Sequence, residues 1–239
     1  MTDRGRTALR QSRDALQVGP SRMAWQNGTL VIDVDEVSAL PMVSRVRGQI
    51  RLMPTAVTKV EARLTPDGSH IWRPFAPSAR IEVDLTQGHS WAGHGYFDAN
   101  FGQAALEADF RRWTWGRFPR AGGGTTCFYD GVRADGSTLA LGLNFAVDGG
   151  AEEIDPPPLA RLSRTAWGIS RSVPCDALAR PRQTMRLLEA PFYSRSVVQT
   201  QIGGETVQGV HEALDLARFR SPFVKAMLAL RVPRRARWP

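Results

Sequence analysis

The densest group of side chains that could do chemistry lies in residues 91–102, which read Trp-Ala-Gly-His-Gly-Tyr-Phe-Asp-Ala-Asn-Phe-Gly. On a β-strand, Tyr96, Asp98 and Asn100 would point to the same face, because successive side chains alternate between the two faces. A phenol, a carboxylate and an amide that line one cavity are costly to bury unless they form hydrogen bonds with one another or take part in binding or catalysis. The spacing therefore indicates a site for acid–base chemistry on this strand.

A second pair at the same spacing lies upstream, where His70 and Trp72 would also share a strand face. An alternative interpretation of these residues is purely structural. Asp98 and Asn100 would then cap a turn, and His70 would be an ordinary surface residue after the turn at residues 67–68. The residues alone leave both interpretations open.

Other motifs of familiar chemistry are incomplete in this sequence. The glycines at 122–124 lack the Gly-Lys-Ser/Thr of a phosphate-binding loop, so they indicate a hairpin turn. His89 and His94 flank Trp91 without a third ligand at metal spacing, so no metal site is expected. No Gly-x-Ser-x-Gly elbow occurs that would present a nucleophilic serine.

The elements that would position these residues are antiparallel strands. Apolar residues alternate with polar ones in three segments, which predicts strands with one buried face: Leu30, Ile32 and Val34; Ile81, Val83 and Leu85; and Leu139, Leu141, Leu143 and Phe145. Turn signals separate the strands at Asn27-Gly28, at residues 66–68, 122–124 and 135–136, and at Gly203-Gly204. We therefore predict a mainly β fold of the sandwich or barrel type.

The segment 149–158 is acidic, poor in apolar residues and ends in three prolines, so it cannot be a central strand. We interpret it as a linker between an N-terminal half (1–148), which carries the site motifs, and a C-terminal β-rich half (159–239). Strands are expected to resume near 162–170, 184–188, 196–202 and 206–216. A short helix should follow, with Ser221 as N-cap and Pro222 at its first position.

Composition limits the partners of the chain. It has 239 residues and a formal net charge of +8, which draws it to anionic surfaces. The N-terminus lacks a signal peptide and no apolar run could span a bilayer, so membrane contact should be peripheral. The arginines are scattered and no aromatic-basic stacking motif is visible, so nucleic acid is not an expected partner. Cys127 and Cys175 fit no metal or disulfide pattern, and both are expected to be free thiols.

Several blocks resemble the carotenoid 1,2-hydratase (hydroxyneurosporene synthase) family. They occur in the family's order and cover the chain from about Arg22 to the C-terminus; they are residues 77–83, 93–102, 113–117, 190–196, 210–212 and 227–233. The resemblance implies a lipocalin-like fold with two antiparallel β-barrel halves. It also implies four active-site residues, a His-x-Trp pair and a Tyr-x-Asp pair, which correspond to His70, Trp72, Tyr96 and Asp98. Asn100, Trp113 and Trp115 belong to these blocks, and Trp91 lies just before one of them; all four are expected to contact the substrate.

The reaction that this resemblance implies is hydration of the terminal double bond of an acyclic carotenoid such as neurosporene or lycopene, without a cofactor. Protonation of C2 leaves a tertiary cation at C1, which water captures. We expect Asp98 to supply the proton, because an apolar pocket can keep a carboxylic acid protonated. Trp72 and Tyr96 would offer π faces to the cation, and His70 would position the water and take its proton.

Two further expectations follow from the apolar substrate. The enzyme must reach the bilayer, and the C-terminal segment 221–237 combines an apolar stripe (Phe223, Met227 and Leu230) with arginines that suit an anionic membrane surface. We place the protein peripherally on the cytoplasmic side of a bacterial inner or photosynthetic membrane. A non-catalytic, lipocalin-like lipid carrier is the alternative function. Family members usually carry a segment before the point that corresponds to Met1, so residues 1–6 resemble an internal stretch of a longer homologue.

Overall fold

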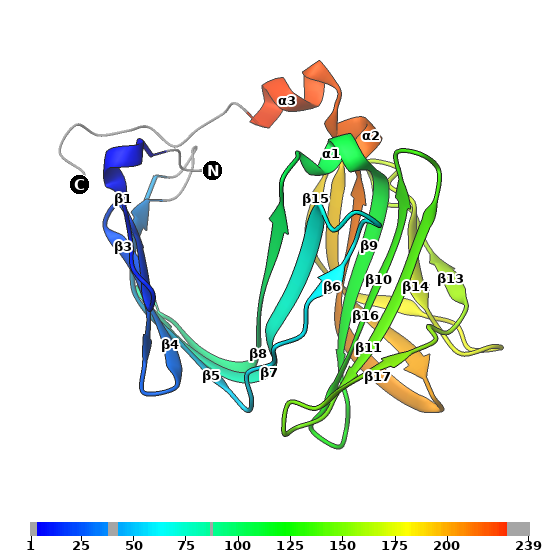
Figure 1. Ribbon diagram of the computed structural model, residues 1–239, viewed down its shortest axis with the longest axis horizontal. Coiled ribbons are helices and arrows are strands. Elements are labelled where there is room, and N and C mark those ends of the chain that lie inside the picture. Colours follow the sequence, from blue (N-terminus) through cyan, green and yellow to red (C-terminus); the bar gives the residue numbers. More distant parts are fainter. Residues whose placement is uncertain (1–3, 38–42, 87, 229–239) are drawn as a thin grey trace. The chain divides into compact units, whose positions relative to one another are not determined.

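A computed structural model describes residues 4–37, 43–86 and 88–228 of the chain (Figure 1). Strands make up most of the described residues, which confirms the prediction of a mainly β protein. The chain divides into two compact units. The first unit contains residues 1–56, 79–97 and 226–239, and the second contains residues 57–78 and 98–225. Two of the four passages of the chain between the units lie within long strands, β7 (His70–Leu85) and β8 (His89–Gly102).

The first sheet has eight strands in the order β1-β2-β3-β4-β5-β7-β6, with β8 paired to β7. Its strands other than β7 and β8 are β1 (Leu9–Gln11), β2 (Ala15–Val18), β3 (Ser21–Gln26), β4 (Thr29–Val37), β5 (Arg45–Pro54) and β6 (Ala62–Arg63). The predicted alternation holds in this sheet. Leu30 lies opposite Leu52, which lies opposite Ile81, and the row Ile32, Ile50 and Val83 follows. Apolar cross-strand pairs of this kind stabilise one face of a sheet.

Two predicted hairpin turns are present with the backbone conformation that their residues favour. Asn27 and Gly28 join β3 to β4 with φ of 51° and 77°. Gly203 and Gly204 join β16 (Tyr193–Ile202) to β17 (Glu205–Asp215) with φ of 60° and 79°. Positive φ at both central residues is the type I′ geometry, whose twist matches that of antiparallel strands.

The second sheet lies entirely in the second unit and has seven strands in the order β12-β11-β10-β9-β17-β16-β15 (Figure 1). Its remaining strands are β9 (Phe110–Pro119), β10 (Thr125–Arg133), β11 (Thr138–Phe145), β12 (Ala151–Ile154) and β15 (Arg182–Ala190). One face packs against the hairpin β13 (Leu159–Leu162) and β14 (Arg171–Pro174). The core on that side includes Phe118, Phe128, Leu162, Val173, Val198, Ile202 and Val207.

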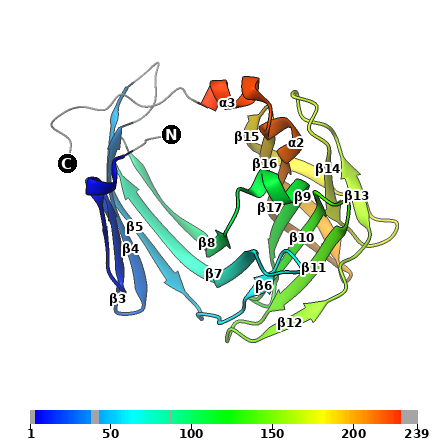
Figure 2. The same cartoon turned by 45° about the horizontal axis from the view of Figure 1, so that its top comes forward.

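The opposite face of the seven-stranded sheet, called the site face here, carries the other set of alternating side chains. The register places Trp113, Trp115 and Arg117 of β9 directly opposite Gly131, Tyr129 and Cys127 of β10. Cys127 and Cys175 are both buried free thiols, as predicted. Two short helices, α1 (Leu106–Asp109) and α2 (Leu216–Phe219), lie next to each other and against β9 at one end of the sheet (Figures 1 and 2).

The sheets do not close into barrels, which corrects the prediction of two barrel halves. Among the described residues, the edge strands of the first sheet are β1, β6 and β8, and those of the second are β12 and β15. The chain leaves β12 through Pro156–Pro158, which cannot donate backbone hydrogen bonds to a further strand. β15 carries two register shifts, after Gln183 and after Arg186, and such bulges protect an open edge.

The segment 149–158 also differs from its expected role as a linker between two β-rich halves. Residues 151–154 form β12, and strands from both sides of the segment, β9–β12 and β15–β17, share one sheet. The segment therefore leads from one sheet edge to the β13–β14 hairpin. The expectation that this segment is not a central strand is confirmed, because β12 is an edge strand. The expected strand at 162–170 is replaced by the end of β13 and a loop that leads to β14.

The C-terminal helix begins at Pro222, as predicted, and α3 spans Pro222–Leu228. The backbone N–H of Lys225 donates to the Ser221 carbonyl, which marks the start of the helix. Phe223 and Met227 are exposed and Val224 is buried. Leu230 and the arginines of residues 231–237 lie outside the described residues.

Candidate active site

The first half of β7 packs on the site face of the seven-stranded sheet within the second unit. Two buried hydrogen bonds fix it there. The Ser78 and Thr125 hydroxyls are 2.8 Å apart, and the Arg117 Nε donates to the Pro77 carbonyl over 2.8 Å. Buried polar groups need such partners, so these bonds set the position of β7 over the sheet. His70 and Trp72 are therefore held against β9 and β10.

Trp72 and Asp98 form a direct pair, as expected for residues of one site. The indole Nε1 of Trp72 donates a hydrogen bond of 2.7 Å to Oδ2 of Asp98. Trp72 is fully buried, with 0% of its surface exposed, whereas Asp98 is partly exposed. The Trp72 ring meets the Tyr129 ring edge to face, with centroids 5.2 Å apart. A carboxylate is thus oriented by an indole at the border of an aromatic cluster.

The aromatic cluster continues along β9 and β10. Tyr129 packs against Trp113 at 5.4 Å, and Trp113 packs against Phe110 at 5.9 Å. The Tyr129 hydroxyl donates to Oδ1 of Asn100 over 3.2 Å. Trp113 and Trp115 are both buried, each with 7% exposed. The cluster brings together Trp72, Asp98, Asn100 and Trp113, and Trp115 lies opposite Tyr129 on the same face.

His70 lies at the start of β7 and is 2% exposed. Its Nε2 is 2.6 Å from Oδ2 of Asp109, and its ring packs edge to face on Phe110 at 5.5 Å. The Nδ1 side of the ring faces Gly102, where an added Cβ would lie 2.5 Å from Nδ1. His70 is therefore enclosed between β8 and the end of α1, with one ring nitrogen occupied by a carboxylate.

This packing predicts the effect of Gly102→Ala. The new methyl group would overlap the His70 ring, and overpacking of this kind costs about 1–3 kcal/mol of unfolding free energy. We expect the variant to show that loss in urea unfolding, together with a shifted His70 ring signal in NMR. Gly122→Ala is the control, since a Cβ there meets nothing within 4 Å. Equal stability of the two variants would contradict the proposed enclosure of His70.

Tyr96 and Trp91 belong to the first unit. Tyr96 is partly buried and lies two residues before Asp98 on β8, so the two share a strand face. Trp91 is 55% exposed and borders a surface pocket of about 560 Å³ together with Arg51, Glu82 and Asp84. The substrate-contact role of Trp91 and the active-site role of Tyr96 stay predictions.

Sequence reasoning missed three residues of this region: Tyr129 and Glu212 on the site face, and Asp109 at the end of α1. Burial raises the pKa of Tyr129, and the negative charges of Asp98 and Glu212 raise it further. Burial also raises the pKa of Glu212; Arg195 opposes this shift, and the charge of Asp98 adds to it. The sequence motif at 210–212 pointed to the right strand, but strand register was needed to bring these residues next to β7 and β8.

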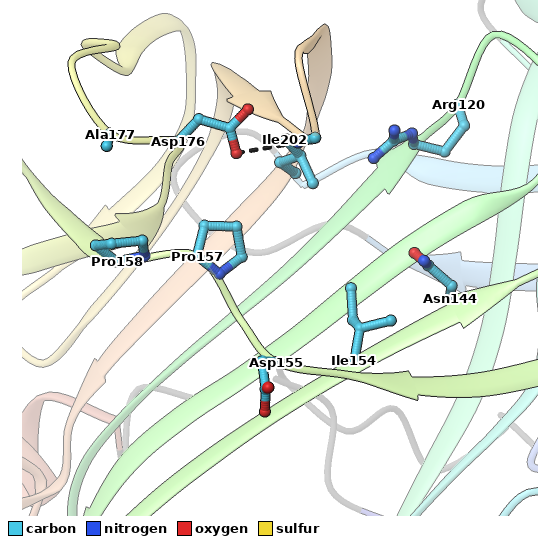
Figure 3. A pocket seen from close by; sticks show the side chains of 10 residues that line it. Arg120, Asn144, Ile154, Asp155, Pro157, Pro158, Asp176, Ala177 and Ile202 are labelled. Carbon is cyan, nitrogen blue, oxygen red and sulfur yellow. Dashed lines mark hydrogen bonds between the residues drawn. The ribbon is translucent and has the colours of Figure 1, made fainter.

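A pocket of about 450 Å³ elsewhere on the second unit involves none of the predicted site residues (Figure 3). Two of its charged groups, Asp176 and Arg120, have structural partners. The Asp176 carboxylate accepts hydrogen bonds from the backbone N–H groups of Gly203 and Gly204, and Arg120 pairs with Glu205 at 2.7 Å. These contacts hold the β16–β17 turn, so the pocket is not part of the candidate site.

Two absences hold for residues 4–37, 43–86 and 88–228. No group of three or more His, Cys, Asp or Glu side chains in these ranges is arranged to hold a metal ion. Within the same ranges, every helix is too short or too polar to cross a bilayer.

Known proteins with similar sequences belong to the same family that the sequence motifs around this cluster resemble. The family model of carotenoid hydratase CrtC matches residues 1–239. An acyclic carotenoid 1,2-hydratase of Cereibacter sphaeroides is 63% identical over 238 residues, covering 100% of this chain and 85% of that protein. A protein of the same name in Rhodobacter capsulatus is 59% identical over 239 residues, with the same coverage of 100% and 85%. One from Thiocapsa roseopersicina is 46% identical over 98% of this chain and 58% of its own length. The chain therefore belongs to the carotenoid hydratase family.

Proposed function

We propose that this chain adds water across the terminal C1=C2 double bond of an acyclic carotenoid, such as neurosporene or lycopene, without a cofactor. The relatives named acyclic carotenoid 1,2-hydratase, at 63% and 59% identity over the whole chain, support the reaction class. The observation that carries the proposal is the Trp72–Asp98 pair, in which a partly exposed carboxyl group adjoins a buried aromatic cluster. An apolar chain can be bound beside a group able to donate a proton.

Asp98 is the proton donor in this proposal. Its Oδ2 accepts the Trp72 N–H, which orients the carboxyl group that gives its acidic proton to C2 of the substrate. A fixed carboxyl orientation matters because proton transfer requires the donor within hydrogen-bond distance of the reacting carbon. Trp72 is completely buried, so we assign it the task of holding Asp98. The partly buried ring of Tyr96, on the same strand face, offers its π face to the tertiary cation at C1.

His70 acts differently from the water-activating base that its sequence position suggested. Nε2 lies 2.6 Å from Asp109, and the Nδ1 side of the ring packs against Gly102, so the ring is enclosed on both sides. We propose that His70 and Asp109 fix the start of β7 and so set the position of Trp72 two residues later. The group that takes the proton from water must then be found elsewhere on the site face.

The direct test is conversion by the purified chain. Lycopene or neurosporene in detergent micelles is incubated with the protein and no added cofactor, in water enriched in ¹⁸O. The expected product is a 1-hydroxy carotenoid that carries the heavy oxygen, detected by liquid chromatography and mass spectrometry. Binding of the carotenoid without product would instead support the lipid-carrier alternative.

We propose further that the protein works as a peripheral protein at an anionic membrane surface, on the cytoplasmic side of a bacterial inner or photosynthetic membrane. The exposed Phe223 and Met227 on α3, followed in sequence by the arginines of residues 231–237, support this placement. Apolar insertion and charge attraction act together in such segments, and each basic residue near the surface adds about 1 kcal/mol.

A vesicle sedimentation assay tests the membrane contact. Deletion of residues 231–239 and the variant Phe223→Ser should each weaken binding to anionic vesicles, and high salt should weaken binding of the intact chain. Leu178→Ser is the matched control, because Leu178 is fully exposed but lies outside this segment. If binding does not respond to the truncation, to Phe223→Ser or to salt, another surface must meet the membrane.

A further inference from the structure

Glu212 shares a row with the aromatic residues of the site. In the strand register, Tyr129 of β10 lies opposite Trp115 of β9, Trp115 lies opposite Glu212 of β17, and Glu212 lies opposite Arg195 of β16. All four side chains therefore point to the site face. Neighbouring strands are about 4.8 Å apart, so the backbone of Glu212 lies roughly 10 Å from that of Tyr129. Long side chains on such a row reach a common space above the sheet.

The exposure of the side chains changes along this row. Tyr129 and Trp115 are buried, the Glu212 side chain is 21% exposed, and the Arg195 side chain is 49% exposed. Leu188 of β15, opposite Arg195, is 53% exposed. Glu212 is thus the point at which the row passes from the apolar cluster to solvent. A group that must meet both water and an apolar substrate belongs at such a border.

The Glu212 carboxylate is held in place by β16. Arg195 Nε lies 3.0 Å from its Oε1, and the Tyr193 hydroxyl donates a hydrogen bond to it. The Arg195 charge favours the ionised carboxylate, whereas burial raises its pKa and so makes it a stronger base than a free glutamate. The negative charge of Asp98 also raises the pKa of Glu212, so the two carboxyl groups interact electrostatically. Paired carboxyl groups of this kind divide acid and base roles.

We propose that Glu212 is the general base of the hydration, the group that takes the proton from the attacking water. This inference rests on the reaction proposed above. The π electrons of the C1=C2 bond take the proton of Asp98 at C2, and a lone pair of water forms the C1–O bond. Glu212 accepts the proton that this oxygen loses. A proton then returns through solvent from Glu212 to Asp98, so that one alkene and one water give one tertiary alcohol.

The first test compares turnover of an acyclic carotenoid by wild type, Glu212→Gln, Glu212→Asp and Glu205→Gln. We expect Glu212→Gln to lower kcat by about 10²-fold, the usual scale of general base catalysis, with carotenoid binding unchanged. Glu212→Asp should keep part of the rate, because the carboxylate remains. Glu205→Gln is the matched control and should turn over at the wild-type rate. Glu205 lies on the same strand and also pairs with an arginine, Arg120, but outside the site.

A second measurement separates catalysis from a structural role. The charged and titratable groups that face Glu212 are Asp98 of β8, Tyr129 of β10, and Tyr193 and Arg195 of β16. Protonation of Glu212 should produce the acidic limb of the kcat/KM profile. Arg195→Gln removes the charge that lowers the pKa of Glu212, so the limb should move to higher pH. The limb should vanish in Glu212→Gln.

The outcomes distinguish this inference from the proposed function. An inactive wild-type chain overturns both. A second outcome is that the wild type is active, Asp98→Asn is inactive, and Glu212→Gln keeps a rate within about threefold of the wild type. This outcome overturns only the role of Glu212, because loss of a general base lowers the rate by far more than threefold. An acidic limb that remains in Glu212→Gln and does not move in Arg195→Gln has the same consequence. Because Arg195→Gln leaves Glu212 in place, this second readout holds even if Glu212→Gln folds poorly.

Discussion

Asp98→Asn is expected to abolish hydration while the protein still folds and binds carotenoid. The amide oxygen of asparagine can accept the Trp72 N–H that Asp98 now accepts at 2.7 Å, so the contact between β7 and β8 is kept. The variant lacks the acidic proton, and the loss of general acid catalysis should cost at least about 10² in rate. Single-turnover conversion of lycopene or neurosporene, followed by chromatography, measures this loss directly.

Asp33→Asn provides the control for that substitution. Asp33 is exposed on β4 and accepts a hydrogen bond from Gln49 Nε2, which an asparagine oxygen can also accept. We expect wild-type turnover in this variant and unchanged thermal unfolding in both. Full activity of Asp98→Asn would contradict the proton-donor role and direct attention to the Tyr96 phenol. Loss of both activity and carotenoid binding would point to a structural role for Asp98.

Local sequence patterns predicted the strands and turns of this fold well. Period-two alternation in 30–34 and 81–85 reports which side chains share a face, and those residues do form apolar cross-strand rows. Asn27-Gly28 and Gly203-Gly204 favour positive φ and mark the hairpins correctly. Sheet closure could not be predicted in this way. Whether the last strand pairs with the first depends on long-range pairing at the edges, and a short stretch of sequence carries no signal for it.

The candidate site shows the same division between local and long-range information. The pairs His70/Trp72 and Tyr96/Asp98 were visible because each lies within one strand at spacing i, i+2. Asp109 and Glu212 contribute one carboxyl group each from segments far along the chain, and only the register and the packing of β7 on the sheet bring them near. The role that we propose for His70 differs from the expected one for this reason, since its partner Asp109 lies 39 residues away in the sequence.

A different buried histidine should make the stability of the protein depend on pH. His211 of β17 lies on the face opposite the site, is 1% exposed, and its Nε2 is 2.8 Å from the Ser172 carbonyl. Since a carbonyl only accepts, Nε2 carries the proton, and Nδ1 has no hydrogen-bond partner among the described residues. Burial lowers the pKa of His211 to about 4; the Ser172 bond opposes the shift and the Arg171 charge adds to it.

The direction of the pH effect follows from proton binding. In the unfolded chain His211 has the ordinary histidine pKa of 6.5, whereas in the folded protein it binds a proton only when the pH falls to about 4. His211 therefore favours the folded state fully above pH 6.5 and loses that contribution as pH falls toward 4. The loss amounts to about 3 kcal/mol of unfolding free energy. Urea unfolding at a series of pH values, compared between wild type and His211→Gln, should show it.

His211→Gln isolates this contribution from those of the many carboxyl groups that also titrate in acid. The glutamine Nε2 can still donate to the Ser172 carbonyl, but it does not titrate, so the stability difference between the two proteins should change by roughly 3 kcal/mol between pH 7 and pH 4. His94→Gln is the control, because it removes an exposed histidine of β8 and should leave the loss of stability attributed to His211 in place. If the His211→Gln curve is parallel to the wild-type curve, His211 binds its proton at the same pH in the folded protein as in the unfolded chain. A proton on Nδ1 would then need an acceptor, which would place a buried water or a shifted Ser196 hydroxyl, its cross-strand neighbour, beside that nitrogen.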